Sequence, residues 1–409
     1  MLEANGVERT QGAPPRTFGP RAMCPVQITM KQEYKIIQDP VNGPIKVEQR
    51  LLRIIDASEV QRLRDIKQLG MVYLVFPGAQ HSRFEHSLGA MHIAGMMAER
   101  LMADRKEEIM AAALLHDIGH PPFSHSFEDL IMERTSMDHQ EAGYRVITGK
   151  KPFEDSTIPA ILEESGFIPR DVAAVAAGRG KGLAGKIISG TIDCDELDYL
   201  RRDAYFCGTT LGIVDHMRVI ETIFADRDIF IDEKGVPAIE ELLVARLMMY
   251  RTVYWHKTAR IAQKMVETAI SHMDIDHTIF STTDQIMLAE ASKNAEARKL
   301  IEKVKRRDLF KPVIKSVYSR ERMEQIMETL KEEISMNRIF VDVIPPLDFS
   351  GSDRVKDSLR VKVSGRFMKL HDVSALSKSL SKSFSRRQII VSCDPDIYDS
   401  VRSAIGSPF

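Results

Sequence analysis

The residues best suited to chemistry are histidines and aspartates gathered in one part of the chain. Seven of the twelve histidines lie between residues 81 and 139. His116 and Asp117 are adjacent and follow the apolar stretch Ile109–Leu115. Neighbouring residues of a helix point about 100° apart, so both side chains reach one ion only where the helix ends. The glycine and the two prolines that come next predict such an end.

His86 and Asp195 complete a candidate metal site with His116 and Asp117. The helix that carries His86 is expected to pack antiparallel to the helix that ends at His116, because only a short turn joins them. Two imidazoles and two carboxylates form a mixed nitrogen and oxygen ligand set, which suits iron, manganese, zinc or nickel. A lone buried histidine is more often structural, but a folded core has no use for so many polar rings. The sequence therefore predicts a bound divalent transition metal.

Three more histidines, His120, His125 and His139, are too many to be ligands as well. A neutral imidazole beside a phosphate donates a hydrogen bond or protonates a leaving oxygen. Glu128 lies three residues after His125 and could orient that ring. These four residues are the candidate catalytic groups. A structural role is an open alternative for one of the histidines, most of all for His139.

Two sets of polar and aromatic residues recur every four positions and therefore share one face of a helix. They are Asp195, Tyr199 and Asp203 in the first set, and Arg246, Tyr250 and Tyr254 in the second. The tyrosines offer stacking surfaces, and Asp203 offers an acceptor for a hydroxyl group. Core packing is an equal alternative for Tyr250.

The composition is typical of a globular protein that is long enough for two domains. The chain has 409 residues, of which 44% are hydrophobic and 28% charged. A net charge of −1 argues against a protein whose main role is to coat nucleic acid. The four scattered cysteines favour reduced thiols in a cytoplasmic protein. No apolar run approaches the roughly 18 residues of a membrane span, and the start lacks the apolar core of a signal peptide.

The pattern of the chain predicts a mainly α protein, with an all-helical body and a small α+β lobe at the C-terminus. Residues 1–30 are polar and rich in glycine and proline, so they are expected to form a flexible arm or to precede the native start. Residues 31–337 are expected to form the helical domain. Residues 338–409 are expected to form the lobe, because β-branched alternation begins at Arg338.

Local signals predict individual elements. An Asn-Gly turn at residues 42–43 separates two short extended pieces. Asp56 and Glu59 fit a capping box that opens a helix running to Gly70. One long helix is expected over residues 237–273, further helices to about residue 337, strands over 338–343, 359–363 and 388–392, and a helical stretch over 372–384.

Four segments of the chain resemble the HD-domain phosphohydrolases. They are residues 81–89, 114–128, 137–143 and 192–203, and they include the run HDIGHPPFSHSFE. The match is closest to the branch of deoxynucleoside triphosphate triphosphohydrolases. It runs in continuous register over about residues 33–270 and more loosely through the C-terminal lobe.

The resemblance implies a helical HD bundle whose metal ligands are His86, His116, Asp117 and Asp195. It implies that His120 and His139 shape the phosphate site and that His125 is the general acid. The implied reaction is hydrolysis at the α-phosphate of a dNTP, with Mg²⁺ on the substrate phosphates, releasing a deoxynucleoside and inorganic triphosphate. The matching nucleotide contacts are Arg83, Tyr199, Asp203, Arg246 and Tyr254, and the matching deoxyribose contacts are Gln68 and Leu69.

Two positions depart from the pattern of the family. The residue after the metal aspartate is Glu196, where the family has a phosphate-binding lysine. A carboxylate there would repel a triphosphate unless it points away or meets a second metal. Trp255 replaces an amide on the side expected to face the base. Both changes leave the catalytic step intact and leave the identity of the substrate open.

The resemblance also implies an activator site for GTP or dGTP between the subunits of a homo-oligomer, a dimer or a tetramer. The matching residues are Lys35, Asp56, Gln61 and Arg64, and all four keep the residue type of the family. Asp56 could accept the guanine N–H donors, Arg64 could meet the guanine edge, and Lys35 could meet the phosphate. The alternative is structural, with Asp56 as a helix cap and Gln61 and Arg64 on a solvated helix face.

Two other functions stay open at this point. HD sites also serve phosphodiesterases and pyrophosphohydrolases of other nucleotides, which would release a monophosphate or pyrophosphate. The second alternative is a nucleic-acid-binding regulatory protein with a vestigial HD site. A vestigial site has no reason to keep every ligand, so nucleic-acid binding is a secondary expectation, and no membrane partner is expected.

Overall fold

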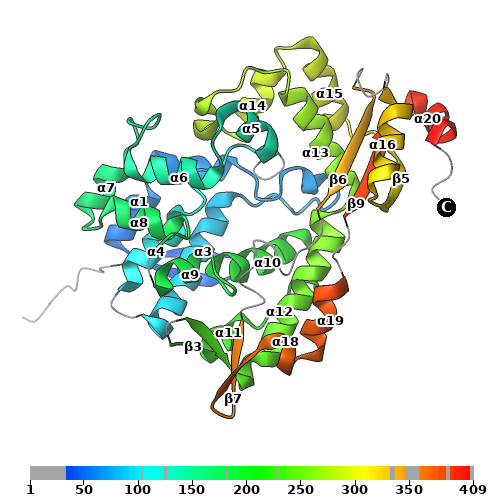
Figure 1. Cartoon of the computed structure of the whole chain (residues 1–409). Coiled ribbons are helices and arrows are strands. Elements are labelled where there is room, and N and C mark those ends of the chain that lie inside the picture. The colour runs from blue at the N-terminus through cyan, green and yellow to red at the C-terminus, as the bar shows by residue number, and fades with distance from the viewer. Residues whose placement is uncertain are drawn as a thin grey trace, which may run out of the picture. The chain divides into compact units, whose positions relative to one another are not determined.

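The computed structural model describes residues 34–102, 105–123, 127–180, 182–226, 228–331, 337–345, 359–383 and 387–405. The expected arm over residues 1–30 and the candidate catalytic His125 lie outside these ranges. The described chain is mainly helical with small sheets (Figure 1), which confirms the predicted fold class.

The described chain begins with a β-hairpin. β1 (Tyr34–Asp39) pairs antiparallel with β2 (Gly43–Glu48), and the Asn-Gly turn lies where the sequence predicts it. Gly43 has a φ of 72°, a left-handed backbone conformation that glycine adopts without steric cost. The last residue of β1, Asp39, is buried and ion-paired with Arg202. The hairpin is therefore attached to the interior by its turn end.

The predicted capping box at Asp56 is wrong. The apolar run before it already forms α1 (Gln49–Ile55), and Asp56 follows the last residue of that helix. α2 (Ser58–Gln61) passes directly into a 3-10 turn over Arg62–Asp65, so the helix does not continue to Gly70. Asp56 is instead the C-cap residue of α1 through its backbone N–H, and its exposed side chain does not cap α2.

Three helices form the core that carries the candidate site. α3 (Arg83–Leu101) packs against both α4 (Lys106–Leu115) and α10 (Cys194–Cys207). Gly89 on α3 is required by this packing, because a side-chain carbon there would lie 1.9 Å from Oδ1 of Asp198 on α10. Because the two helices approach so closely, facing residues of α3 and α10 contact each other directly.

Shorter helices surround this core. They are α5 (Glu128–Thr135), α6 (His139–Thr148), α7 (Ile158–Glu164), α8 (Pro169–Ala176), α9 (Leu183–Ile188) and α11 (His216–Thr222). α8 packs against α4, α6 and α9, which buries its apolar face. Among the described helices, none is both long enough and apolar enough to cross a membrane.

The long helix predicted over residues 237–273 is divided in the structure. α12 (Val236–Met249) continues into a π-helical turn over Tyr250–Tyr254, and α13 (Lys257–Ile270) follows. The Trp255 N–H donates to the carbonyl oxygen five residues earlier. Such wide turns occur frequently at functional sites, because they redirect side chains that regular helical spacing would place elsewhere. The apolar periodicity of the sequence does not reveal the turn.

The chain then forms two helices and a three-stranded antiparallel sheet with its own helices. These elements are α14 (Asp284–Ala291), α15 (Ala295–Lys305), β5 (Lys311–Val317), α16 (Arg320–Thr329), β6 (Ile339–Ile344), β9 (Gln388–Cys393) and α20 (Tyr398–Ile405). β9 is the central strand, between β5 and β6. The expectation of helices alone up to residue 337 is wrong at β5, whose apolar residues pack beside β9 in the smaller of two cores.

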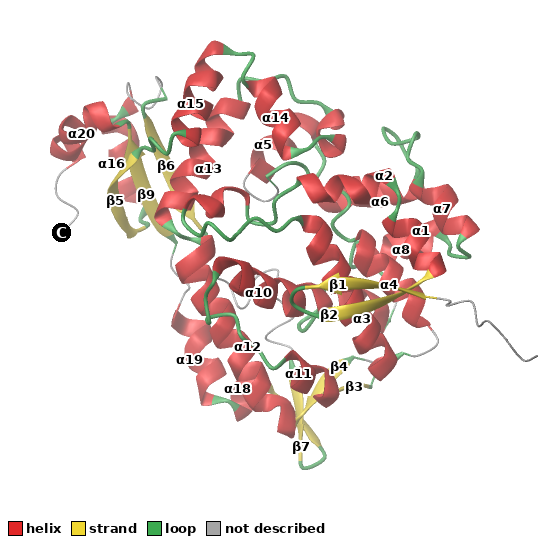
Figure 2. Ribbon diagram, turned by 180° about the vertical axis from the view of Figure 1, so that it is seen from behind, coloured by secondary structure: helices red, strands yellow, loops and turns green. Residues whose placement is uncertain are grey.

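A second sheet joins the middle of the chain to its C-terminal part (Figure 2). Its strands are β3 (Ile223–Ala225), β4 (Ile229–Asp232), β7 (Arg360–Val363) and β8 (Arg366–Lys369), followed by α18 (Leu370–Val373) and α19 (Ala375–Ser383). β7 pairs parallel with β4, and α19 packs against α12. Hydrogen-bonded strands therefore cross the predicted domain boundary between residues 337 and 338.

Candidate metal centre and substrate cavity

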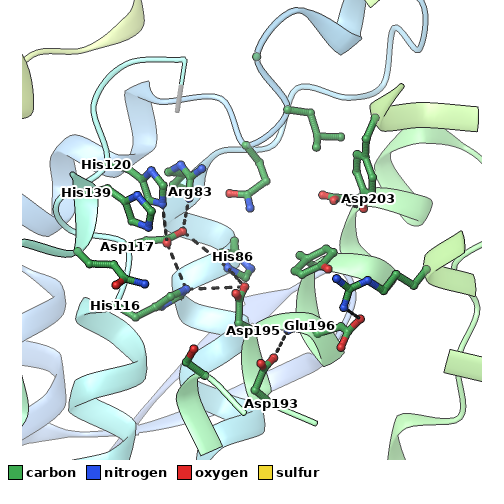
Figure 3. A pocket seen from close by; sticks show the side chains of 18 of the residues that line it. Arg83, His86, His116, Asp117, His120, His139, Asp193, Asp195, Glu196 and Asp203 are labelled. Atoms are coloured by element: carbon green, nitrogen blue, oxygen red, sulfur yellow. Dashed lines mark hydrogen bonds and ion pairs between the residues drawn. The ribbon is translucent and has the colours of Figure 1, made fainter. Parts of the chain in front are cut away.

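Four side chains from three parts of the core face one common centre (Figure 3). His86 lies on α3, His116 and Asp117 follow the last residue of α4, and Asp195 lies in the first turn of α10. Nε2 of His86 is 3.0 Å from Oδ1 of Asp195 and 3.7 Å from Oδ2 of Asp117. Nε2 of His116 is 3.3 Å from Oδ1 of Asp117 and 3.8 Å from Oδ1 of Asp195.

This arrangement fits a metal ion. Ligand atoms of His86, His116 and Asp117 all lie within 4.8 Å of one another. Nδ1 of His116 donates to the carbonyl oxygen of Ala113 at 2.6 Å, so Nε2 carries the lone pair that faces the centre. Among the described residues, this Nε2 is buried without a hydrogen-bond partner. A buried polar atom without a partner is rare, and ligation of a metal would satisfy it.

Asp198 supports His86 from the side away from the centre. Nδ1 of His86 donates to Oδ2 of Asp198 at 3.0 Å, which leaves Nε2 directed at the ligand carboxylates. Asp198 accepts two N–H groups of Arg202, at 2.7 and 2.9 Å, and Arg202 also donates to Asp39 at 2.8 Å. The four-residue spacing of Asp198 and Arg202 was the signal in the sequence for this pair, which the motif-based prediction missed.

The ligands differ in their protonation. Burial lowers the pKa of His86, but hydrogen bonds to Asp195 and Asp198 raise it, and the resulting pKa is about 10. Burial raises the pKa of Asp195, but the nearby imidazoles of His116 and His86 hold that pKa well below its usual range. The carboxylates are therefore charged, and the proton on His86 is one that an incoming metal must displace.

A second pair of rings lies beside Asp117. Nε2 of His120 is 3.3 Å from Oδ1 of Asp117, and the His120 ring stacks on that of His139 with centroids 4.1 Å apart. His139 begins α6, and its Nδ1 is hydrogen-bonded to the carboxylate of Glu128. Glu128 thus contacts His139, whereas its predicted contact with His125 lies outside the described residues.

Close backbone packing holds this ring pair in place. A side-chain carbon on Gly119 would lie 2.2 Å from the nitrogen of Gly143 and 2.2 Å from the carbonyl oxygen of His139. Only glycine therefore allows this loop to contact α6. Burial and the charge of Arg83 hold the pKa of His120 well below its usual range. A neutral His120 can donate a hydrogen bond to a phosphate oxygen.

The metal centre opens into a cavity of about 630 Å³. All seven predicted substrate contacts line this cavity: Gln68, Leu69, Arg83, Tyr199, Asp203, Arg246 and Tyr254. Arg83 is ion-paired with Asp117, so it reaches the metal ligands directly. Trp255 and Arg260 also line the cavity, and Arg260 donates to Asp342 of β6 at 2.7 Å. Arg260 thus links the lining of the cavity to the C-terminal part of the chain.

Asp203 is held by two donors in the cavity. Nε2 of His81 lies 2.7 Å from Oδ1 of Asp203, and the hydroxyl of Tyr254 donates to Oδ2 at 2.7 Å. Burial raises the pKa of Tyr254 and of Tyr199 well above the usual range, so both hydroxyls stay protonated. No spacing in the sequence relates His81 to Asp203, and His81 was not predicted as a site residue.

Glu196 points towards Arg246 and does not face the metal centre (Figure 3). Its Oε1 lies 2.8 Å from Nη1 of Arg246, and the two side chains are 5% and 13% exposed. The position where the family has a lysine therefore carries the acidic half of a buried ion pair. Among the described residues that line the cavity, three are arginines and five are carboxylates. The lining therefore carries groups of both signs, and Glu196 occupies the one arginine that lies beside it.

The predicted activator residues lie away from this cavity. None of them is among the described residues that line it. Lys35 on β1 and Asp56 after α1 have exposed side chains. Arg64 donates to Oε1 of Gln61 at 2.7 Å and stacks on Phe84, 3.6 Å from the ring centroid. The structure thus brings Gln61 and Arg64 together on the surface formed by α2 and the 3-10 turn.

Comparison with known proteins identifies two matching family models. The model of the HD domain matches residues 83–203, and the model of the HD associated region matches residues 214–408. The first range contains all four candidate metal ligands. The second contains the cavity residues Arg246, Tyr254 and Arg260.

Relatives and solved structures agree with these matches. The human deoxynucleoside triphosphate triphosphohydrolase SAMHD1 is 30% identical over 345 residues, which are 68% of this chain and 55% of that protein. A hypothetical protein from Aquifex aeolicus has a TM-score of 0.77 at 32% identity, over 91% of this chain and 100% of that one. A phosphohydrolase from Bacteroides thetaiotaomicron has a TM-score of 0.71 at 26% identity, over 88% and 100%. The chain spans only 49% to 65% of the length of several curated relatives it matches. It belongs to the HD-domain family.

Proposed function

We propose that this chain is a metal-dependent phosphohydrolase that acts on nucleotides. The observation that carries the proposal is the convergence of His86, His116, Asp117 and Asp195 at one end of a large cavity. A divalent metal bound there would lower the pKa of a water molecule and neutralise charge on the phosphoryl oxygens. The relatives named as triphosphohydrolases and the structure titled a phosphohydrolase support this activity.

The residues of the chain itself supply binding, orientation and proton handling. His120 and His139 are proposed to donate hydrogen bonds to the phosphate, because their stacked rings lie beside Asp117. Asp203 is proposed to accept a hydroxyl of the sugar. Its two fixed donors hold the carboxylate in one orientation, so substrate binding does not have to order it.

The substrate is proposed to be a dNTP, hydrolysed to a deoxynucleoside and inorganic triphosphate. The cavity carries the residues that match nucleotide contacts, and Gln68 and Leu69 lie on its wall where deoxyribose contacts are expected. Tyr199 lies edge to face with Tyr254, with ring centroids 6.4 Å apart. A sugar packed against such rings leaves little room for a 2′-hydroxyl, which favours the deoxy substrate.

The chain is further proposed to form a homo-oligomer that binds GTP or dGTP at Lys35, Asp56, Gln61 and Arg64. Asp56 is not the N-cap of α2, so the N-cap role predicted for its side chain does not compete with this proposal. Saturating GTP is then expected to accelerate hydrolysis of a second dNTP and to convert dimers into tetramers, measured by product assay and by light scattering. An unchanged rate together with an unchanged mass would contradict this part of the proposal.

One observation favours a second substrate class. The Glu196–Arg246 pair cancels a positive charge that a triphosphate would otherwise use. A phosphodiester substrate carries fewer negative charges than a triphosphate and would be disfavoured less. A phosphodiesterase acting on another nucleotide is therefore the second candidate function, grouped with a pyrophosphohydrolase because HD sites serve both.

Identification of the product distinguishes the two candidates. The purified chain would be incubated with Mn²⁺ and mixed dNTPs, with and without GTP, beside Asp117→Ala, and the products separated by ion exchange. Deoxynucleoside plus inorganic triphosphate, absent in the variant, is expected. Release of monophosphate or pyrophosphate would support the second candidate, and no hydrolysis of any dNTP would contradict the first.

A further inference from the structure

Two side chains outside the HD domain fasten the loops that carry the metal ligands and the deoxyribose contacts. We define the metal loop as residues 116–123 and the sugar loop as residues 67–70. Both loops line the cavity. Neither Arg62 nor Asp284 lines the cavity among its described residues, and neither belongs to the HD motifs.

Asp284 joins the two loops through one carboxylate. It is the first residue of α14 and is 5% exposed. Its Oδ1 accepts the Phe123 N–H at 2.9 Å, and its Oδ2 accepts the Lys67 N–H at 2.9 Å. Phe123 has a φ of 56°, a left-handed conformation that is strained for a non-glycine residue. A buried carboxylate that holds two backbone N–H groups in two separate loops fixes the distance between them.

Arg62 fastens the metal loop from the other side. Its Nη2 donates to the carbonyl oxygens of Ile118 at 2.8 Å and His120 at 3.1 Å, and its Nη1 donates to that of Thr282 at 3.0 Å. Thr282 lies two residues before Asp284. Arg62 and Asp284 therefore tie the metal loop to one short segment, residues 282–284, which lies within the HD associated region.

We infer that Arg62 and Asp284 are positioning residues. Through them the HD associated region sets the distance between the metal loop and the sugar loop. The kinetic part of this inference rests on the proposed hydrolysis, but the structural part does not. A carboxylate is needed at residue 284, because an asparagine has one acceptor oxygen and would direct its NH₂ group at the other backbone N–H. Asp284→Asn should therefore release one of the two loops.

The test compares Asp284→Asn with Asp276→Asn. Asp276 is an exposed N-cap eight residues earlier that accepts the Thr278 N–H, and asparagine caps as well as aspartate. Amide hydrogen exchange would be followed at Lys67 and Phe123 and across α3 and α10. In Asp284→Asn we expect at least one of the two loop amides to exchange about 10-fold faster, with wild-type rates in the helices. The control should match wild type throughout.

Kinetics gives the second readout. We expect Asp284→Asn to lower kcat/KM by about 100-fold, because catalysis is sensitive to displacements near 1 Å. Unchanged exchange at both amides, or faster exchange spread equally over α3 and α10, would overturn the inference. If Asp284→Asn does not fold, Arg62→Lys, which keeps the charge and loses the forked donors, is tested instead, and amide exchange is followed over the whole metal loop. If the wild type hydrolyses no nucleotide, the proposed function fails. The exchange result still decides whether Asp284 holds the two loops in place.

Discussion

Two parts of the cavity are held in different ways. At the metal end three of the four candidate ligands are each held by a further group: His86 by Asp198, His116 by the carbonyl of Ala113, and Asp117 by Arg83. Elsewhere in the cavity Arg246 is paired with Glu196, and a substrate phosphate must compete with that carboxylate. These three ligands are thus oriented before a substrate binds. The Glu196–Arg246 pair is where a change of a single residue can alter which substrate is accepted.

The largest expected effect is the loss of a ligand at the metal end. Asp195→Ala should lower kcat/KM by about 1000-fold or more, because a bound metal stabilises the transition state by several kcal/mol. The measurement is hydrolysis of the best dNTP at saturating Mn²⁺. Activity within tenfold of wild type would show that the metal end does not depend on the four ligands together.

Removing the support behind a ligand should have a smaller effect. Asp198→Asn keeps the shape of the side chain but weakens the hydrogen bond to His86 and the pair with Arg202. Loss of such a supporting group costs about 10- to 100-fold in metal affinity. The Mn²⁺ dissociation constant can be measured by calorimetry. An affinity equal to that of wild type would mean that His86 needs no support.

The pKa of His86 predicts how metal affinity depends on pH. The folded pKa is raised from 6.5 to about 10, so the ring stays protonated until high pH, and the metal must displace that proton. Metal affinity should therefore fall about tenfold for each pH unit below 10, within the range where the protein stays folded. The folding stability of the metal-free protein depends on pH with the opposite sign. The stabilisation by protonated His86 is fully present below pH 6.5 and is lost as the pH rises through about 10. An affinity that is flat between pH 7 and 9 would contradict the raised pKa.

The smallest expected effect belongs to the Glu196–Arg246 pair. Glu196→Gln should leave Arg246 in place and remove the competing charge, which should lower KM for a triphosphate by about tenfold, on the order of one charge-assisted hydrogen bond. The same change should alter KM for a nucleoside monophosphate less. An equal effect on both substrates would show that Glu196 does not discriminate by charge.

The metal end could be predicted from the sequence because its residues stand in short motifs. His116 and Asp117 are adjacent, the helix before them ends as the glycine and prolines predict, and Asp195 lies one turn from Tyr199. Residue identity and local spacing were therefore sufficient to predict that these side chains lie together in one cavity. The ligand roles themselves stay predictions until metal binding is measured.

The remaining parts could not be predicted, because they depend on contacts between distant segments. Asp284 holds two loops that are more than 160 residues earlier in the chain. His81 and Asp203 are 122 residues apart. The π turn after α12 follows from packing and leaves no signal in apolar periodicity. β5 was predicted as helical, although the strand is required by its partner β9, which lies about 70 residues later.

The most direct test of the metal centre is its stoichiometry. The purified chain and His116→Ala would be loaded with Mn²⁺, dialysed, and analysed for bound metal per chain. His116 is the sharpest choice, because its Nε2 is buried without a hydrogen-bond partner among the described residues. One tightly bound ion in the wild type, lost in the variant, is the predicted result. Equal metal content in both proteins would contradict the four-ligand centre on which the account rests.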